Sequence, residues 1–363
     1  MQRYAKKTVA VVRHVLCCAG LCAGVLFVAA PFSCKMTDEG VAVSATDKDA
    51  PKIVSFRGTQ RSVLAIACDE PMTLTDVAFK TAGDGETFAQ VTDIAYDESG
   101  QNAELTLDRP MEIGDKYELT GIVADANGNT LAFSLPFTGY NDHPAHMMLT
   151  ELRYDKSDKT AKQMKVEFIE LYVLAGGNMA GLELYGGYHG NKTRYTFPAI
   201  EVKAGEYVTV HLRNYGGDAD ETGDALDQPS TSPDVSDTGR DLWVTGTEDS
   251  YFTQNDVVVL VDAVSGNIMD AVLLTKDETK TTWTYKTQTA LAEQAVAAGV
   301  WQGGSDRSYA ALSNGMGVTK TLSRQNVAAV VAAYAAGGAQ AVTASKADWT
   351  LGTPTPGKEN VSQ

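Results

Sequence analysis

Residues 255–262, Asn-Asp-Val-Val-Val-Leu-Val-Asp, form the most strand-like run of the chain. Branched apolar residues in such a run favour extended backbone. The turn residues 265–267, Ser-Gly-Asn, follow, and a second apolar run occupies 268–272. The two runs and the turn predict a β-hairpin, so we expect this half of the chain to be built from β-sheet.

The same half contains further strands and two alanine-rich stretches. Apolar and polar residues alternate at 149–152, 166–172 and 205–212, which places the apolar side chains of each run on one face. The stretches at 289–300 and 327–341 are rich in alanine instead. Because alanine favours the helix, they predict short helical insertions that pack on the sheets.

The first half of the chain follows the same rule with shorter strands. Residues 51–140 alternate short apolar runs with turns, and Asn127-Gly128 supports the positive φ of a hairpin. This pattern is typical of an antiparallel sandwich. The expected strands lie at 63–68, 104–107, 117–123 and 131–135.

Three stretches of the first half resemble the bacterial Ig-like domain of S-layer and other surface proteins. Residues 68–72 resemble its strand-ending Glu-Pro phrase, and 113–117 resemble its turn and tyrosine before a long strand. Residues 121–129 resemble its Asp-x-x-Gly-Asn hairpin. The resemblance implies an Ig-like sandwich in this half.

The second half resembles the lamin tail domain, an Ig-like fold that also occurs in bacterial exported proteins. Residues 149–152 and 167–171 resemble its paired first strands, and 349–360 match its closing signature. Leu182 stands where that family has tryptophan. The resemblance extends over 147–360, with insertions.

We therefore expect an all-β chain of two tandem Ig-like β-sandwiches, the second with short Ala-rich helical insertions, after an N-terminal signal segment. Two domains of this size bury enough apolar surface to be stable without disulfides. The expected segments are a signal peptide at 1–33, a tether at 34–49, a bacterial Ig-like domain at 50–140, a linker at 141–146 and a lamin-tail-like domain at 147–361.

The first 33 residues have the composition of an export signal. They contain four basic residues and no acid, and the uncharged run at 15–30 is short for a membrane-spanning helix. Cys34 follows a small residue, Ser33, which resembles a bacterial lipoprotein signal in which the cysteine is lipidated. Pro31 replaces the usual leucine of that signal. A plain cleaved signal and an uncleaved membrane anchor are the alternatives.

The cysteines and the charge balance agree with export. If Cys34 is lipidated, Cys68 has no partner, and its place in a strand predicts a small buried side chain. The chain has 30 basic and 46 acidic residues and a net charge of -16. Removal of the signal leaves 26 basic and 46 acidic residues, a net charge of -20. This acidity disfavours nucleic acid, so we expect no nucleic-acid partner.

The sequence lacks the motifs of hydrolases, nucleotide-binding loops and zinc sites, so we expect no enzyme and no cofactor. His143 and His146 are three residues apart; a metal pair and solvated linker residues are both open interpretations. His211 is expected at the rim of its strand. Glu167 and Glu170 fall on opposite faces of a strand and cannot form an acid–base couple.

The acidic insertion at 218–241 is the remaining candidate site, with eight acids and one base. Asp218, Asp220 and Asp224 offer hard oxygen ligands for calcium, although the closing glutamate of the EF-hand pattern is missing. A weak calcium site and a solvated insertion both stay open.

Tyrosines 185, 188 and 195 line a carbohydrate or peptide surface in one interpretation and belong to the core or rim in another.

The function that we predict is a non-enzymatic exported lipoprotein of the cell envelope, held at the periplasmic or outer surface by a lipid anchor on Cys34. It would bind a protein or glycan through sandwich loops and strand edges. An accessory to a secreted nuclease and a calcium-stabilised surface module are the alternatives.

Overall fold

The computed structural model describes residues 48–155, 165–188, 190, 193–213, 234–236, 238–244 and 250–360. Lys48–Gln363 forms one compact unit. Of the described residues, 45% are in strands and 12% in helices, which confirms the predicted all-β, sandwich-type fold. No helix within the described ranges has the length and apolar character needed to cross a membrane.

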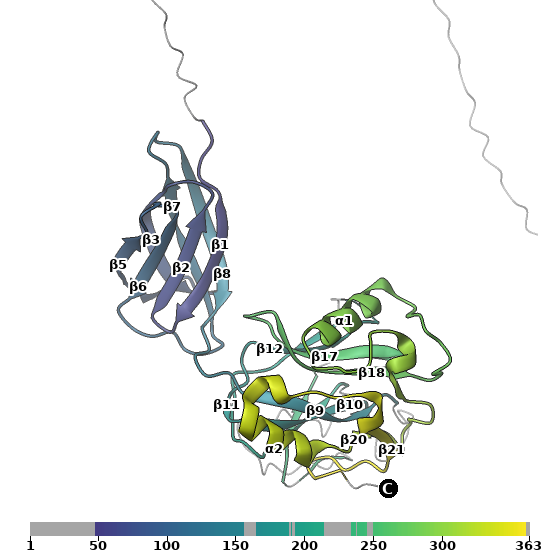
Figure 1. Cartoon of the computed structure of the whole chain (residues 1–363). Helices are drawn as coiled ribbons and strands as arrows, with labels where there is room; N and C mark the ends of the chain where they lie inside the picture. Colours follow the sequence, from purple (N-terminus) through teal and green to yellow (C-terminus); the bar gives the residue numbers. More distant parts are fainter. Residues whose placement is uncertain are drawn as a thin grey trace, which may run out of the picture. The chain divides into compact units, whose positions relative to one another are not determined.

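The first sandwich consists of two four-stranded antiparallel sheets (Figure 1). One sheet has the order β1-β2-β6-β5, with β1 at its edge, and the other has the order β4-β3-β7-β8, with β8 at its edge. The strands are β1 (Ile53–Gln60), β2 (Val63–Cys68), β3 (Thr73–Thr81), β4 (Thr87–Ala89), β5 (Val91–Tyr96), β6 (Asn102–Leu107), β7 (Lys116–Ala124) and β8 (Thr130–Thr138).

Alternation along the strands supplies the core of this sandwich. Leu64, Ile66 and Cys68 of β2 are buried, as the period of two predicts. Burial raises the pKa of the Cys68 thiol to about 11, so the side chain is a neutral hydrophobe, as expected. The Asp125 carboxylate accepts the Asn127 and Asn129 backbone N–H groups at 2.9 and 2.8 Å, which closes the predicted hairpin.

The second sandwich pairs a six-stranded sheet, β16-β15-β10-β9-β20-β21, with a five-stranded sheet, β13-β12-β17-β18-β19. Two short strands, β11 and β14, pair with each other. The strands are β9 (His146–Arg153), β10 (Phe168–Ala175), β11 (Gly177–Asn178), β12 (Leu182–Gly186), β13 (Arg194–Thr196), β14 (Glu201–Val202), β15 (Tyr207–His211), β16 (Arg240–Trp243), β17 (Asp256–Asp262), β18 (Asn267–Thr275), β19 (Ala311–Leu312), β20 (Thr321–Arg324) and β21 (Trp349–Gly352).

The strand-like run at 255–262 lies at the centre of the five-stranded sheet. It forms β17, which pairs with β12 on one side and with β18 on the other. All of its residues except Asp262 are buried. The predicted hairpin to β18 is therefore confirmed, and the continuous apolar run reflects burial on both faces of the strand.

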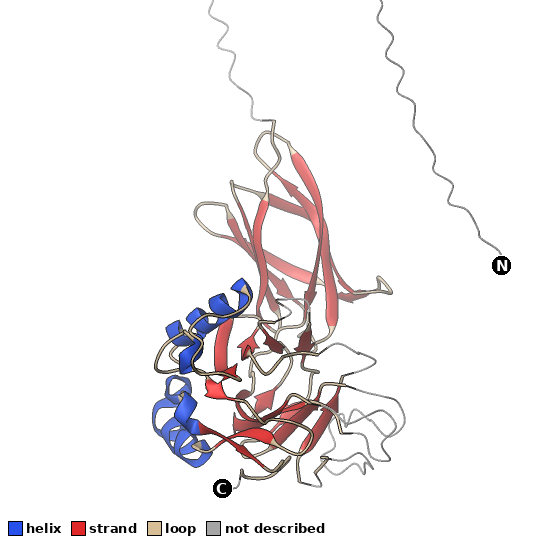
Figure 2. Cartoon of the chain, turned by 90° about the vertical axis from the view of Figure 1, so that its right-hand side faces the viewer, coloured by secondary structure: helices blue, strands red, loops and turns tan. Residues whose placement is uncertain are grey.

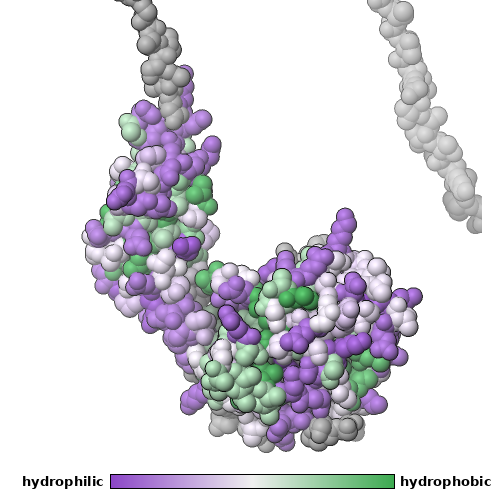
Figure 3. Space-filling model, viewed as in Figure 1, coloured by the Kyte–Doolittle hydropathy of each residue, from purple (hydrophilic) through white to green (hydrophobic). Residues whose placement is uncertain are grey.

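Two helices lie on one side of the second sandwich (Figure 2). They are α1 (Lys286–Ala297) and α2 (Val327–Gly337), and both fall on the predicted alanine-rich insertions. Val327 and Val330 of α2 pack against Met148 and Leu174 of the six-stranded sheet. The outer face of α2 exposes its alanines, and Figure 3 shows a pale apolar area where this helix lies. The 3-10 turns are η1 (Arg307–Tyr309), η2 (Gly338–Ala341) and η3 (Lys346–Asp348).

Candidate functional site

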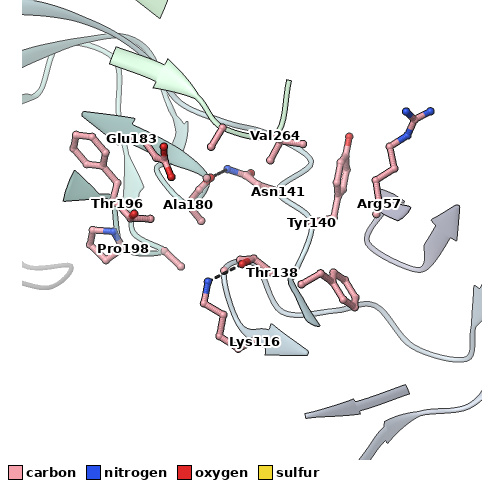
Figure 4. A pocket seen from close by; sticks show the side chains of 18 of the residues that line it. Arg57, Lys116, Thr138, Tyr140, Asn141, Ala180, Glu183, Thr196, Pro198 and Val264 are labelled. Atoms are coloured by element: carbon pink, nitrogen blue, oxygen red, sulfur yellow. Dashed lines mark hydrogen bonds between the residues drawn. The ribbon is translucent and has the colours of Figure 1, made fainter. Parts of the chain in front are cut away.

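A cavity of about 630 Å³ lies beside the segment that follows β8, and residues of both sandwiches line it (Figure 4). We call it the junction cleft. On one side, the rings of Phe56 in β1 and Phe137 in β8 meet edge to face, with centroids 5.1 Å apart. The remaining walls include Arg57, Lys116, Thr138, Tyr140, Asn141, Ala180, Glu183, Thr196, Pro198 and Val264.

Two glycines allow the chain to approach closely around the junction cleft. A Cβ on Gly58 would lie 3.1 Å from the Cβ of Tyr140. Gly114 has φ of +81°, and a Cβ there would lie 2.6 Å from the Cβ of Ala199. A larger residue at Gly114 would force its surroundings to shift, and one at Gly58 would push Tyr140 by a few tenths of an ångström, so both glycines favour the shape of the cleft.

Asn141 fixes the segment between the sandwiches at the wall of the junction cleft. Its side-chain N–H₂ donates to the carbonyl oxygens of Asn178 and Ala180 at 2.8 and 2.9 Å. Its Oδ1 accepts the backbone N–H of His143 at 3.1 Å. Asn141 is 8% exposed, so these bonds satisfy a buried amide and position the cleft lining.

The charged side chains of the junction cleft leave a positive surplus. Glu183 is neutralised by an ion pair with Arg194, whose guanidinium lies 4.1 Å from the centre of the Tyr185 ring. Lys116 donates to Thr138 Oγ1 at 2.6 Å and retains two further ammonium N–H groups. Arg57 is exposed. An anionic group is therefore favoured here, although the chain as a whole is acidic.

The junction cleft has the size and lining of a binding site. Its volume lies within the range of small-molecule and peptide sites, which often form between domains. Aromatic and aliphatic walls with a few charged groups match that class of site.

A second cluster of charged residues is buried on the six-stranded sheet. Glu151 and Glu170 are cross-strand neighbours and are fully buried. The backbone N–H groups of Thr355 and Gly357 donate to them at 3.0 and 2.6 Å. Thr150 donates to Glu170 at 2.7 Å. The segment after β21 thus covers both carboxyl groups and closes them off from solvent.

The environment of these two glutamates favours their protonated form. Burial raises the pKa of Glu170 well above its ordinary value, and the neighbouring Glu151 raises it further. Burial also raises the pKa of Glu151. Two carboxyl groups that share a dry site in this way hold the covering segment by hydrogen bonds, and no substrate reaches them.

The structure corrects the prediction that His211 is a rim residue. Its side chain is fully buried, its Nε2 lies 2.7 Å from Asp241 Oδ1, and its ring stacks on Trp243 at 3.9 Å. Asp241 belongs to β16, which pairs in parallel with β15 and covers His211. The acidic insertion therefore contributes at least one acid to a buried hydrogen bond instead of to solvent.

Two other acids, one from the insertion and one next to β10, pair with buried arginines. Asp234 accepts from Arg153 at 2.5 Å, and Glu167 accepts from Arg213 at 2.9 Å. Glu167 and Glu170 have different partners and form no acid–base couple. Such pairing with an opposite charge is what buried charged groups require.

The remaining predicted site residues fall in two groups. Cys34 and the calcium candidates Asp218, Asp220 and Asp224 lie outside the described residues, so these predictions stay open. Within the described ranges, no group of three or more His, Cys, Asp or Glu side chains could hold a metal ion.

The two neighbouring histidines have separate surroundings. The ring nitrogens of His143 contact Asp142 at 2.6 Å and Glu201 at 3.0 Å, and the bond to Asp142 is the main cause of its raised pKa. His146 begins β9, and its ring lies 5.0 Å from that of Tyr334. The two imidazoles are therefore engaged with different partners, which argues against a shared metal.

The three tyrosines considered for a binding surface also separate. Tyr185 and Tyr195 are 8% and 9% exposed and belong to the core of the second sandwich. Tyr188 is 37% exposed, and its ring meets that of Tyr285 at 5.2 Å on the surface. Core packing is thus the correct interpretation for the first two.

A family model described as the second domain of the TP_1001 protein matches residues 145–351, which is more than half of the 363 residues. A Treponema pallidum (strain Nichols) protein described as uncharacterized is 27% identical over 261 residues, which cover 69% of this chain. The chain spans 63% of the length of that relative.

Two solved structures show weak similarity. The N-terminal part of the bacterial S-layer protein SbsC has a TM-score of 0.25 at 14% identity, over 34% of this chain and 41% of that chain. A DUF4876 family protein from Bacteroides thetaiotaomicron VPI-5482 has a TM-score of 0.29 at 11% identity, over 71% of this chain and 84% of that chain. Similarities of this size indicate neither a shared fold nor a shared function. The resemblance to the lamin tail domain stays a prediction.

Proposed function

The chain belongs to the TP_1001 second-domain family, and we propose that it is a non-enzymatic binding protein of the cell envelope, exported and anchored by a lipid on Cys34. The junction cleft is the proposed binding site. Its 630 Å³ volume, aromatic wall and positive surplus are the observation that carries the proposal. The partner is a protein or a glycan of the envelope.

The N-terminal sequence supports the location. A basic start, an uncharged run at 15–30 and Cys34 after a small residue have the order of a lipoprotein signal. Lipidation would hold the sandwiches close to a membrane, where a weak binding site gains from the high local concentration of partners. The mass of the mature N-terminal peptide tests this part, because a diacylglyceryl Cys34 differs from a plain cleaved end. An unmodified cysteine or an intact signal would contradict the anchor.

A solid-phase screen tests the binding function. Residues 47–363, which include the whole compact unit, would be applied to immobilised envelope proteins and glycans. A ligand that binds this protein should be lost when Thr196 in the junction cleft is changed to tryptophan, because the larger ring fills the cavity. Thr350→Trp is the matched control, since Thr350 is also an exposed strand threonine but does not line the cleft.

The outcomes of this screen are distinct. Binding that the Thr196→Trp variant loses and the Thr350→Trp variant retains supports the proposal. If no envelope ligand is found, or if every ligand binds both variants equally, the junction cleft is not the functional site. Circular dichroism of both variants would confirm that each one is folded.

A further inference from the structure

The polar side chains of the junction cleft are mostly engaged within the chain. Asn141 is bonded to two carbonyl groups, Glu183 to Arg194 and Lys116 to Thr138. A sugar needs several side-chain donors and acceptors to replace its water, and Asn141, Glu183 and Thr138 already have partners within the chain. The inference that follows names the partner class and rests on the proposed function.

Backbone groups supply what the side chains lack. The edge strand β1 lines the junction cleft with Phe56, Arg57 and Gly58, and it pairs only with β2. Alternate residues of an edge strand present unpaired N–H and C=O groups outward. An extended peptide can use such groups as an additional strand, and alternate side chains then enter pockets beside the edge.

The other edge strand of this side of the cleft is less suited to strand addition. β8 contains Pro136, which has no backbone N–H and is typical of protected edges. β1 contains no proline, and its register with β2 is regular from Ser55 to Gly58, between two irregularities. The regular part of β1 is therefore the part that lines the junction cleft.

The charges beside β1 select the side chains of the added strand. Arg57 is exposed on β1 itself, and Lys116 lies beside Thr138 on another wall of the junction cleft (Figure 4). Glu183, the acid among the described lining residues, is already paired with Arg194. A segment with acidic residues is therefore attracted, and a basic one is repelled.

We propose that the junction cleft binds an extended, acidic peptide segment of a partner protein, which adds as a strand to the outer edge of β1 at Ser55–Gly58. Main-chain hydrogen bonds to β1 hold the segment, its apolar side chains contact Phe56 and Phe137, and its carboxylates face Arg57 and Lys116.

The test titrates residues 47–363 with a six-residue probe, acetyl-Thr-Glu-Val-Glu-Val-Thr-amide. Binding is followed by NMR through the backbone amide chemical shifts of the protein. We expect saturable shifts centred on Ser55–Gly58. The same peptide with N-methyl groups on all six residues has no main-chain N–H left in those residues to donate to β1, so its affinity should fall by about tenfold or more. A peptide with lysine in place of both glutamates should bind about tenfold more weakly.

A matched pair of protein variants tests the charge. Arg57→Ser should weaken binding of the acidic peptide about threefold, the size expected of an exposed ion pair. Arg109→Ser removes another exposed arginine of the first sandwich that does not line the cleft, and it should leave binding unchanged.

Several outcomes would overturn the inference. Equal binding of the N-methylated peptide would exclude strand addition, and equal binding of the lysine peptide would exclude selection by charge. The inference would also be overturned if the screen found a glycan whose binding the Thr196→Trp variant loses, while the acidic peptide caused no change in amide chemical shifts. The proposed function would then remain intact. If neither the screen nor the peptides give binding, both proposals fail.

Discussion

Replacing Arg324 with methionine should destabilise the second sandwich by about 3–5 kcal/mol, the cost of breaking a buried ion pair by removing one partner. The Arg324 and Asp270 side chains are both fully buried, and Nη1 lies 2.7 Å from Oδ2. Arg324 belongs to β20 and Asp270 to β18, so the pair joins the two sheets.

The surroundings of the pair explain the magnitude. Arg324 also donates to the carbonyl oxygens of Thr343 at 2.7 Å and Leu149 at 3.3 Å. Asp270 accepts the Leu149 backbone N–H at 2.7 Å. Methionine fills a similar volume but leaves the Asp270 carboxylate without its cation and the two carbonyl groups without a donor. A buried polar group that loses its partner lowers the free energy of unfolding by much more than the paired group contributes to it.

Urea denaturation followed by tryptophan fluorescence measures the effect. All four tryptophans of the chain lie in the second half of the sequence, at 243, 283, 301 and 349, so the signal reports this sandwich. Arg324→Met should lower the free energy of unfolding by more at pH 8 than at pH 5. Without its cation, the buried Asp270 must be protonated to stay folded, and protonation is more costly at higher pH.

Two further variants separate the ion pair from general packing. Arg194→Met breaks the partly exposed pair with Glu183 and should cost less than about 1 kcal/mol. The double variant Arg324→Met with Asp270→Leu should recover about half or more of the single loss, because an apolar pair leaves no buried charge. The reasoning would be refuted if Arg324→Met lowered the free energy of unfolding by no more than Arg194→Met does. It would also be refuted if the double variant were no more stable than Arg324→Met.

Three other changes test the buried acids and the covering segment. Burial raises the pKa of Asp256 to about 7, so stability should fall by at most about 4 kcal/mol as pH rises from about 4 to about 7. Asp256→Asn should flatten that fall in urea midpoints; a wild-type midpoint that rises over this range would contradict it. Glu170→Gln should leave stability near that of wild type at pH 6 and exceed it at pH 9, because the raised pKa of Glu170 makes its ionisation costly. Lower thermal midpoints for this variant at both pH values would count against a protonated Glu170. Gly357→Ala should destabilise by about 1–3 kcal/mol, since φ is +71° and the new Cβ would lie 2.2 Å from Ser236 Oγ. Gly266→Ala, with φ of +74° and open space, is its control in the same melts and should cost less.

The buried glutamate pair shows how far the sequence reaches. Residues 149–152 and 167–171 were expected to be paired strands, and β9 and β10 are hydrogen-bonded neighbours. That pairing brings the two strands together, but it does not say whether Glu151 and Glu170 face each other. The register with its bulge at Glu170–Leu171, which decides the answer, depends on packing that no local pattern contains.

His211 and the junction cleft show what the sequence does not reach. The partner of His211 is Asp241, 30 positions away on a parallel strand that the acidic composition of the insertion concealed. The junction cleft brings Phe56, Tyr140 and Thr196 together from three distant parts of the chain. Their types are common in any sandwich, so nothing in their spacing marked them as one site.

The sequence by itself determined the class of structure, because strand alternation, turn residues and alanine-rich helices are local preferences with fixed periods. It therefore predicted β17, the hairpin to β18, α2 and the buried Cys68. Only the tertiary structure decided which charges are buried in pairs and where a cavity remains. Those properties depend on long-range pairing and on side-chain volume at close contacts, such as Gly58 against Tyr140, which the chain sets only when it folds.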